Sequence, residues 1–182
     1  MLLSKPQKYM IDTLKELKCL RASQLHALTR NAFQPQMNIA PHHTEIMLRQ
    51  LRTISSVVRI KEDIVSYGER SPDARRLEAI DVMLELTENK PSYFSCQGIS
   101  SPRLLCFTGS NELERVLFSV AWLEAPIQIV TISRMKGERI IWLSNTITPE
   151  TLGVLPQHHF FAQLQNDDSH RYFGSMELQE IK

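Results

Sequence analysis

Two arginines one helical turn apart are the side chains of this sequence best suited to bind an anion. Arg49 and Arg52 fall in residues 41–55, where apolar residues recur at helical spacing, and both lie opposite that apolar stripe. A guanidinium fork donates two parallel hydrogen bonds to a phosphate or to a guanine edge. The spacing therefore predicts a row of donors suited to nucleic acid, with a merely solvated helix face as the alternative.

Further donors accompany this pair. The β-branched runs 57–60 and 64–67, separated by Lys61-Glu62-Asp63, predict a hairpin directly after the helix. Glu45 shares the polar helix face and is unfavourable beside phosphate. The predicted binding set comprises the polar residues of this helix face and the cations of the hairpin: His42, His43, Arg49, Gln50, Arg52, Thr53, Arg59 and Lys61.

The elements before this helix must hold it in place. Periodic apolar residues predict a helix over residues 6–17, and Ser23 is a suitable N-cap for a short second helix ending near Arg30. Residues 31–40 lack periodicity and predict a loop. Within residues 41–55, Thr44, Met47, Leu48, Leu51 and Ile54 are expected to face inward.

The order helix, helix, helix, hairpin resembles a winged helix-turn-helix. The likeness rests on Arg21-Ala22-Ser23-Gln24-Leu25, on Leu48-Arg49-Gln50-Leu51 and on residues 57–67. It implies that helix 42–55 enters the major groove, with Arg49, Gln50 and Arg52 against bases, and that the wing, with Lys61, meets the adjacent backbone. Residues 31–42 depart from the pattern, because they exceed the tight turn of a simple helix-turn-helix.

Charge is divided unevenly along the chain. Residues 1–76 carry 13 Lys or Arg against 7 Asp or Glu, a net +6, and the remainder carries 8 against 13, a net −5. This asymmetry favours an anionic partner for the amino-terminal part. Chance clustering of charges on solvated faces is the alternative.

Composition limits the class of protein. The chain has 182 residues, 42% of them hydrophobic, with only 6 Gly and 9 Pro, which argues against collagen-like, disordered and disulfide-scaffold proteins. No apolar run approaches the roughly 20 residues of a membrane span, so we expect a cytoplasmic protein that does not contact membranes. Three cysteines without C-x-x-C spacing fit reduced, structural thiols.

A connector helix is predicted over residues 71–90. Ser71 is its expected N-cap, Pro72 lies in the first turn, and an apolar stripe continues to about Asn89. The stripe is compatible with core packing and with a homodimer contact, and that alternative stays open. We thus expect three parts: a winged-helix domain (1–70), the connector (71–90) and a small α/β domain (91–182).

Strand and helix patterns in residues 91–182 predict a small mixed sheet. We expect a strand at 104–107, a helix at 111–124, a hairpin of 127–132 with 139–143, a short helix after Pro149 and a closing strand at 172–178. The predicted fold class is α+β: an N-terminal winged helix-turn-helix, a connector helix and a C-terminal mixed α/β sheet.

No catalytic signature stands out in this second part. The sequence lacks the glycine-rich phosphate loops, the G-x-S-x-G elbow and the H-E-x-x-H pair. The E-x-K triplet that a nuclease would need occurs as residues 180–182, where fraying would spoil its positioning, and the 127–144 hairpin carries no acid within its expected strands. His158, His159 and His170 with Asp167 and Asp168 have no fixed ligand spacing and are expected to be surface residues. We therefore expect no enzyme, cofactor or metal.

The domain order also resembles, more loosely, replication-relaxation type proteins of bacterial mobile elements. That likeness implies an accessory DNA-binding role in mobile-element replication or transfer. The function we expect is that of a non-enzymatic DNA-binding protein, accessory or regulatory, in transcription or in mobile-element replication or transfer. The expected partner is duplex DNA, with residues 91–182 serving dimerisation or a protein partner. The alternative is a protein-interaction or ligand-sensing module with a repurposed winged helix, for which the aromatic pairs at 93–94, 160–161 and 172–173 are candidate contacts.

Overall fold

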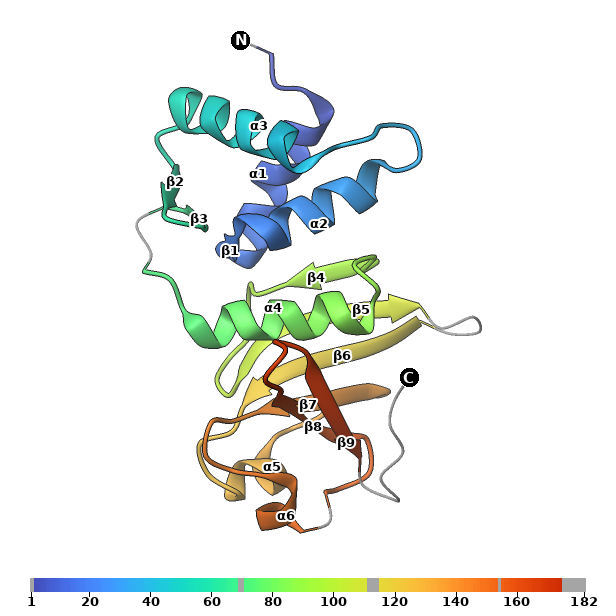
Figure 1. Cartoon of the computed structure of the whole chain (residues 1–182). Coiled ribbons are helices and arrows are strands. Elements are labelled where there is room, and N and C mark those ends of the chain that lie inside the picture. Colours follow the sequence, from blue (N-terminus) through green and yellow to red (C-terminus); the bar gives the residue numbers. More distant parts are fainter. Residues whose placement is uncertain (1, 69–70, 111–114, 154, 175–182) are drawn as a thin grey trace. The chain divides into compact units, whose positions relative to one another are not determined.

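The computed structural model describes residues 2–68, 71–110, 115–153 and 155–174. The chain forms two compact units: residues 1–90 with 95–97, and residues 91–94 with 98–182. Helices and a three-stranded antiparallel sheet make up the first unit, and a six-stranded mixed sheet dominates the second (Figure 1). The predicted α+β class is confirmed at this level.

The first unit contains four helices and three strands in its described part. These are α1 (Lys5–Leu17), β1 (Cys19–Arg21), α2 (Ala22–Phe33), α3 (Pro41–Ile54), β2 (Val58–Lys61), β3 (Ile64–Tyr67) and α4 (Ala74–Leu86). The predicted first helix, third helix and hairpin are confirmed with small shifts of their ends. β3 lies in the middle of the sheet, paired antiparallel with β1 on one side and β2 on the other.

Two predicted helix starts were wrong. Helix α2 begins at Ala22 rather than after Ser23, because Arg21 ends strand β1 and its N–H donates to the Gln24 side chain at 2.9 Å. A three-residue strand such as β1 is too short to leave a periodic signal. Helix α4 begins after Asp73, whose carboxylate accepts from the Arg75 N–H at 3.1 Å, so Ser71 is not its N-cap.

Two predicted helix ends also moved. Helix α2 continues to Phe33, three residues beyond the expected end near Arg30. The loop predicted over residues 31–40 is therefore shorter and comprises residues 34–40. Helix α4 stops at Leu86 rather than near Asn89, because Glu88 and Asn89 both have positive φ values, of 49° and 62°. Such a backbone cannot continue a right-handed helix.

The second unit is built on a sheet of strand order β4-β5-β6-β7-β8-β9. Its central pairs β6–β7 and β7–β8 are parallel, and β5–β6 and β8–β9 are antiparallel. The elements are β4 (Tyr93–Ser95), β5 (Arg103–Ser110), β6 (Arg115–Trp122), α5 (Ile127–Thr131), β7 (Glu138–Leu143), α6 (Pro149–Leu152), β8 (His159–Leu164) and β9 (His170–Gly174).

The strand at 104–107 and the short helix after Pro149 are confirmed as β5 and α6. The closing strand is β9, which ends at Gly174, and the rest of its predicted range lies outside the described residues.

The helix predicted over residues 111–124 was wrong. Residues 115–122 form β6, and residues 111–114 lie outside the described part of the chain. β6 is hydrogen-bonded on both sides, to β5 and to β7. An interior strand that is buried on both faces shows a continuous apolar run instead of alternation, and such a run can imitate a helix face.

The predicted hairpin over residues 127–143 was also wrong. Its first half is helix α5, and its second half is β7, which runs parallel to β6. The Gln128 side chain accepts from the N–H groups of Glu124 and Ala125, at 2.7 and 3.1 Å, and folds the chain into a helical turn. Contrary to expectation, β7 does carry an acid, since Glu138 is its first residue.

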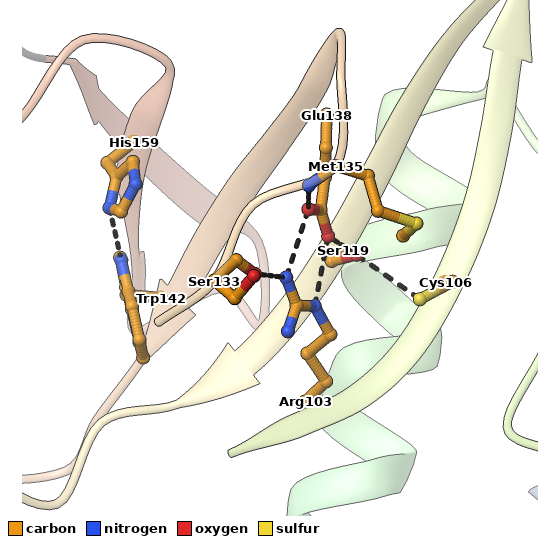
Figure 2. Close-up of polar contacts among 8 residues, drawn as sticks. All are labelled: Arg103, Cys106, Ser119, Ser133, Met135, Glu138, Trp142 and His159. Carbon is orange, nitrogen blue, oxygen red and sulfur yellow. Dashed lines mark hydrogen bonds and ion pairs between the residues drawn. The ribbon is translucent and has the colours of Figure 1, made fainter. Parts of the chain in front are cut away.

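Glu138 is a fully buried carboxylate held by four hydrogen bonds (Figure 2). Arg103 donates from Nε and Nη2 at 2.9 Å each, Ser119 donates from Oγ, and the Met135 N–H donates at 2.7 Å. Burial alone would raise the pKa of Glu138, but these bonds outweigh it and leave the pKa below the ordinary glutamate value. The network ties β5, β6 and β7 together at one point of the sheet.

Apolar packing completes the second unit. Its core cluster comprises Ala121, Ile140, Trp142, Phe161 and Phe173 from strands β6 to β9, Ile129 from α5, and Leu123 and Leu155 from connecting segments. No helix in the described ranges is long and apolar enough to cross a membrane.

Replacing Arg103 with Met should lower the free energy of unfolding by about 3 to 5 kcal/mol, because it leaves the buried Glu138 carboxylate without its cation. The double variant Arg103→Met/Glu138→Gln should recover most of that loss, since a neutral amide needs no cation: its Oε1 can accept from the Met135 N–H while its Nε2 donates to the Ser119 hydroxyl. Urea titrations of the full chain, followed by tryptophan fluorescence, measure both. A double variant no more stable than the single one would contradict the charge argument.

Candidate nucleic-acid interface

Helix α3 packs through a narrow face. Thr44, Leu48 and Leu51 are buried, and Met47 is half-buried. Ile54 was expected to face inward, but 44% of its surface is exposed, because it lies at the end of the helix, away from the buried line. The Thr44 hydroxyl is 2.9 Å from His26 Nδ1 on α2, so a polar contact as well as apolar packing fixes α3.

The eight residues of the predicted binding set are all exposed. Six of them lie on α3 and two, Arg59 and Lys61, lie two residues apart on β2. The structure therefore places the set on one helix and the hairpin strand that follows it (Figure 1). Exposure alone does not distinguish donors that can leave for a ligand from donors already engaged within the protein.

Arg49 and Arg52 differ in their neighbours. Arg49 Nη2 is 3.9 Å from Glu45 Oε2, one turn earlier on α3. Both side chains are highly exposed, and an ion pair in water is worth little, so Glu45 does not hold Arg49 strongly. Arg52 forms no ion pair with any residue in the described ranges. Both guanidinium groups can therefore turn toward a ligand.

Gln50 is partly engaged. Its Oε1 accepts a hydrogen bond of 2.8 Å from Gln7 Nε2, which links α3 to α1. Reading adenine requires the amide to donate and accept at once, and here the acceptor already has a partner inside the protein. The structure thus gives Gln50 a positioning contact that the sequence pattern did not reveal.

The beginning of α3 is organised by its histidines. The rings of His42 and His43 lie 3.9 Å apart between centroids, and His43 Nδ1 accepts from the Ala40 N–H at 3.3 Å. Thr53, near the other end, donates from Oγ1 to the Arg49 carbonyl at 3.1 Å. His43 and Thr53 therefore use one polar atom each inside the helix or its cap.

The hairpin has basic and acidic parts. Arg59 and Lys61 alternate with the inward residues Val58 and Ile60, so both cations belong to the same face of β2. The turn itself is Glu62-Asp63, with Glu62 at a φ of 56°. Cations suited to a phosphate backbone therefore lie on the strand, and the turn is acidic.

Polar residues of the second unit are mostly committed to its own structure. His159 was expected at the surface but is buried, and its Nδ1 accepts from Trp142 Nε1 at 3.1 Å (Figure 2). Burial, with help from nearby Arg134, lowers the pKa of His159. His170 is buried too, and Asp167 accepts from the Ser169 hydroxyl. Within the described residues, no group of three or more His, Cys, Asp or Glu side chains could hold a metal ion.

Sequence reasoning missed Ile46. Counted round the helix from the buried line, Ile46 falls near the middle of the exposed face, and 49% of its surface is accessible. Its helical position was available from the sequence, but a search for polar chemistry passes over an apolar residue.

Comparisons with known proteins add little. No protein-family model matches the chain, and no curated protein matches it. Among solved structures, the crystal structure of protein VC1899 from Vibrio cholerae aligns with 79% of this chain and 48% of that chain, at 8% identity and a TM-score of 0.20. The chain spans about half the length of that protein, and such a low TM-score informs neither fold nor function.

The His26 contact predicts a pH effect on the unit that carries α3. Burial, and secondarily Arg30, lowers the pKa of His26 below its ordinary value of 6.5. The unfolded chain then binds a proton more readily than the folded one, so stability is full above that value and declines as the pH falls below it. His26→Asn, which does not titrate, should show a smaller loss of urea midpoint between about pH 7.5 and about pH 5.5.

The difference between wild type and variant isolates this effect, because His159 and the carboxylates titrate equally in both. An identical pH dependence of the two proteins would refute the assignment to His26.

Proposed function

We propose that the first unit is a winged helix-turn-helix that binds duplex DNA through α3 and strand β2, and that the protein acts without catalysis as an accessory or regulatory factor in transcription or mobile-element replication. The observation that carries this proposal is the exposure of Arg49, Arg52, Arg59 and Lys61 together on consecutive elements of one unit. No other class of ligand accounts as well for four cations on a helix and an adjoining strand.

Dimensions and charge support this choice. A helix with its side chains is roughly 10 to 12 Å across, and the major groove is about 12 Å wide. Arginine forks on the exposed face of α3 would lie against base edges or flanking phosphates, and residues 1–76 carry a net charge of +6. Most of the affinity would come from neutralised phosphates and would fall steeply with salt.

The hairpin would bind by its strand and not by its tip. Arg59 and Lys61 are suited to a neighbouring phosphate, whereas Glu62 and Asp63 would be repelled by one. This arrangement limits how deeply the turn can enter a groove and leaves α3 as the reading element.

A protein-interaction module is the second candidate, and one observation favours it. Ile127 and Val130, one turn apart on α5, are 63% and 72% exposed. The aromatic pairs contribute less, because Phe161 and Phe173 are buried and only Tyr93 is largely exposed among the six rings. Residues of the second unit would then contact a protein partner or a second copy, whether or not α3 binds DNA.

The double variant Arg49→Ala/Arg52→Ala should weaken binding to a labelled random duplex by about 1 to 3 kcal/mol for each arginine that contacts a base, and should reduce the salt dependence. Fluorescence anisotropy at low and moderate salt measures both quantities. The matched control is Arg134→Ala/Lys136→Ala, which removes two exposed cations from the second unit and changes net charge equally. Equal losses in the two double variants, or wild-type binding insensitive to salt, would refute the proposal.

Glu45→Gln should tighten duplex binding by roughly two- to fivefold, because it removes a negative charge from the binding face and frees Arg49. Asp12→Asn is the control, since Asp12 also forms an exposed ion pair within a helix of the first unit, with Lys15 at 3.1 Å. An unchanged or weaker affinity for Glu45→Gln would place α3 away from the phosphates.

A further inference from the structure

The exposed face of α3 has an apolar centre. Ile46, Arg49 and Thr53 are spaced by three and four residues, so they follow one another along a single line of the helix. Glu45 and Arg52 flank this line on one side and Gln50 on the other. Ile46, with 49% of its surface accessible, is thus an aliphatic side chain at the middle of an otherwise polar surface.

Hydrogen bonds within the protein make this line still less polar. The Thr53 hydroxyl donates its proton to the Arg49 carbonyl, so it has no proton left to donate to a ligand and offers its methyl and acceptor lone pairs. The Gln50 carbonyl accepts from Gln7. Arg49, in an exposed ion pair with Glu45 at 3.9 Å, is therefore the charged residue of the line, and it lies between the Ile46 side chain and the Thr53 methyl.

The major groove offers one apolar feature to such a surface. The C5 methyl of thymine is the sole hydrocarbon group on the edges of the four bases, and aliphatic side chains recognise it by contact. The cations around Ile46 match the charge of the duplex, whereas a typical apolar protein interface is depleted of charge at its centre. The occupant that fits both the charge and the aliphatic centre is DNA.

We propose that Ile46 selects thymine by contacting its C5 methyl, beside a base or phosphate held by Arg49. This inference rests on the proposed function, because it requires α3 to enter the major groove. Ile46 would then determine specificity without forming any hydrogen bond, and the recognised site would contain a thymine that no polar residue of the protein need contact.

Deoxyuridine in place of thymine tests the inference, because it removes the methyl and leaves every hydrogen-bonding group of the base pair in place. A duplex site is first selected from a randomised library with the wild-type chain, and each thymine of that site is then replaced singly. At one position we expect wild-type affinity to fall about fourfold, the value expected for one buried methyl. Ile46→Ala should bind the thymine and deoxyuridine forms of that position equally.

Two further variants serve as controls. Ile54→Ala removes a comparably exposed aliphatic side chain roughly 80° farther round α3, and it should keep the wild-type preference for thymine. Ile46→Val should keep a reduced preference, and circular dichroism should show that each variant is as helical as wild type. Because Ile46 lies on the exposed face, these substitutions leave the core of the unit intact.

The outcomes separate the two proposals. Absence of salt-dependent duplex binding by the wild-type chain would overturn the proposed function and this inference with it. Salt-dependent binding with no selected sequence, or with no thymine at which methyl loss and Ile46→Ala have coupled effects, would overturn the inference alone. A coupled effect with Ile54→Ala instead of Ile46→Ala would also overturn it.

Discussion

The central strand of the small sheet sets the geometry of the whole first unit. β3 pairs with β1, which precedes α2, and with β2, which follows α3. Backbone bonds extend the pairing at both ends, from Tyr67 N–H to the Lys18 carbonyl at 2.8 Å and from Ala22 N–H to the Asp63 carbonyl at 2.7 Å. Segments more than forty residues apart are thereby joined, and the surface formed by α3 and its hairpin is anchored to the strand that precedes α2.

That surface combines free and committed groups. Arg49, Arg52 and Lys61 keep their charges exposed, while Gln50 and Thr53 spend hydrogen-bonding capacity inside the unit. Side chains that are already hydrogen-bonded lose less conformational entropy when a ligand binds, but they have fewer unused donors and acceptors for that ligand. The division makes the arginines suited to affinity and the aliphatic centre suited to discrimination.

Sequence patterns predicted the first unit better than the second. Residues 5–17, 41–54 and 58–67 have one buried face each, so periodicity reveals them. Residues 115–122 pair on both sides and are largely buried, so their apolar run carried no period that separates strand from helix. The pairing of β6 with β5 and β7 depends on residues distant in the sequence, so a short stretch of sequence does not reveal it.

The predicted site residues are all exposed, but their local engagements could not be foreseen. A bond such as that from Gln7 to Gln50 joins residues 43 positions apart and depends on how α1 crosses α3. Conversely, Glu138 was overlooked because its strand was expected to begin one residue later, although its burial with Arg103 anchors three strands. The periodicity of the sequence predicts which side chains are exposed, whereas tertiary packing decides which of them hydrogen-bond to one another.

Gln7, on helix α1, sets the orientation of the Gln50 amide on the surface of α3. Its Oε1 accepts from the Ser4 N–H at 2.9 Å as part of the cap of α1, so its amide nitrogen must face Gln50. Glutamate at position 7 would preserve the cap of α1, because a capping box accepts Glu or Gln at this position. It would also place a carboxylate oxygen opposite Gln50, so the Gln50 amide would have to rotate and donate from Nε2. The donor and acceptor pattern displayed by α3 thus depends partly on a residue in the first turn of α1. Exchange of the amide nitrogen of Gln7 for an oxygen would reverse which end of the Gln50 amide is left for a ligand.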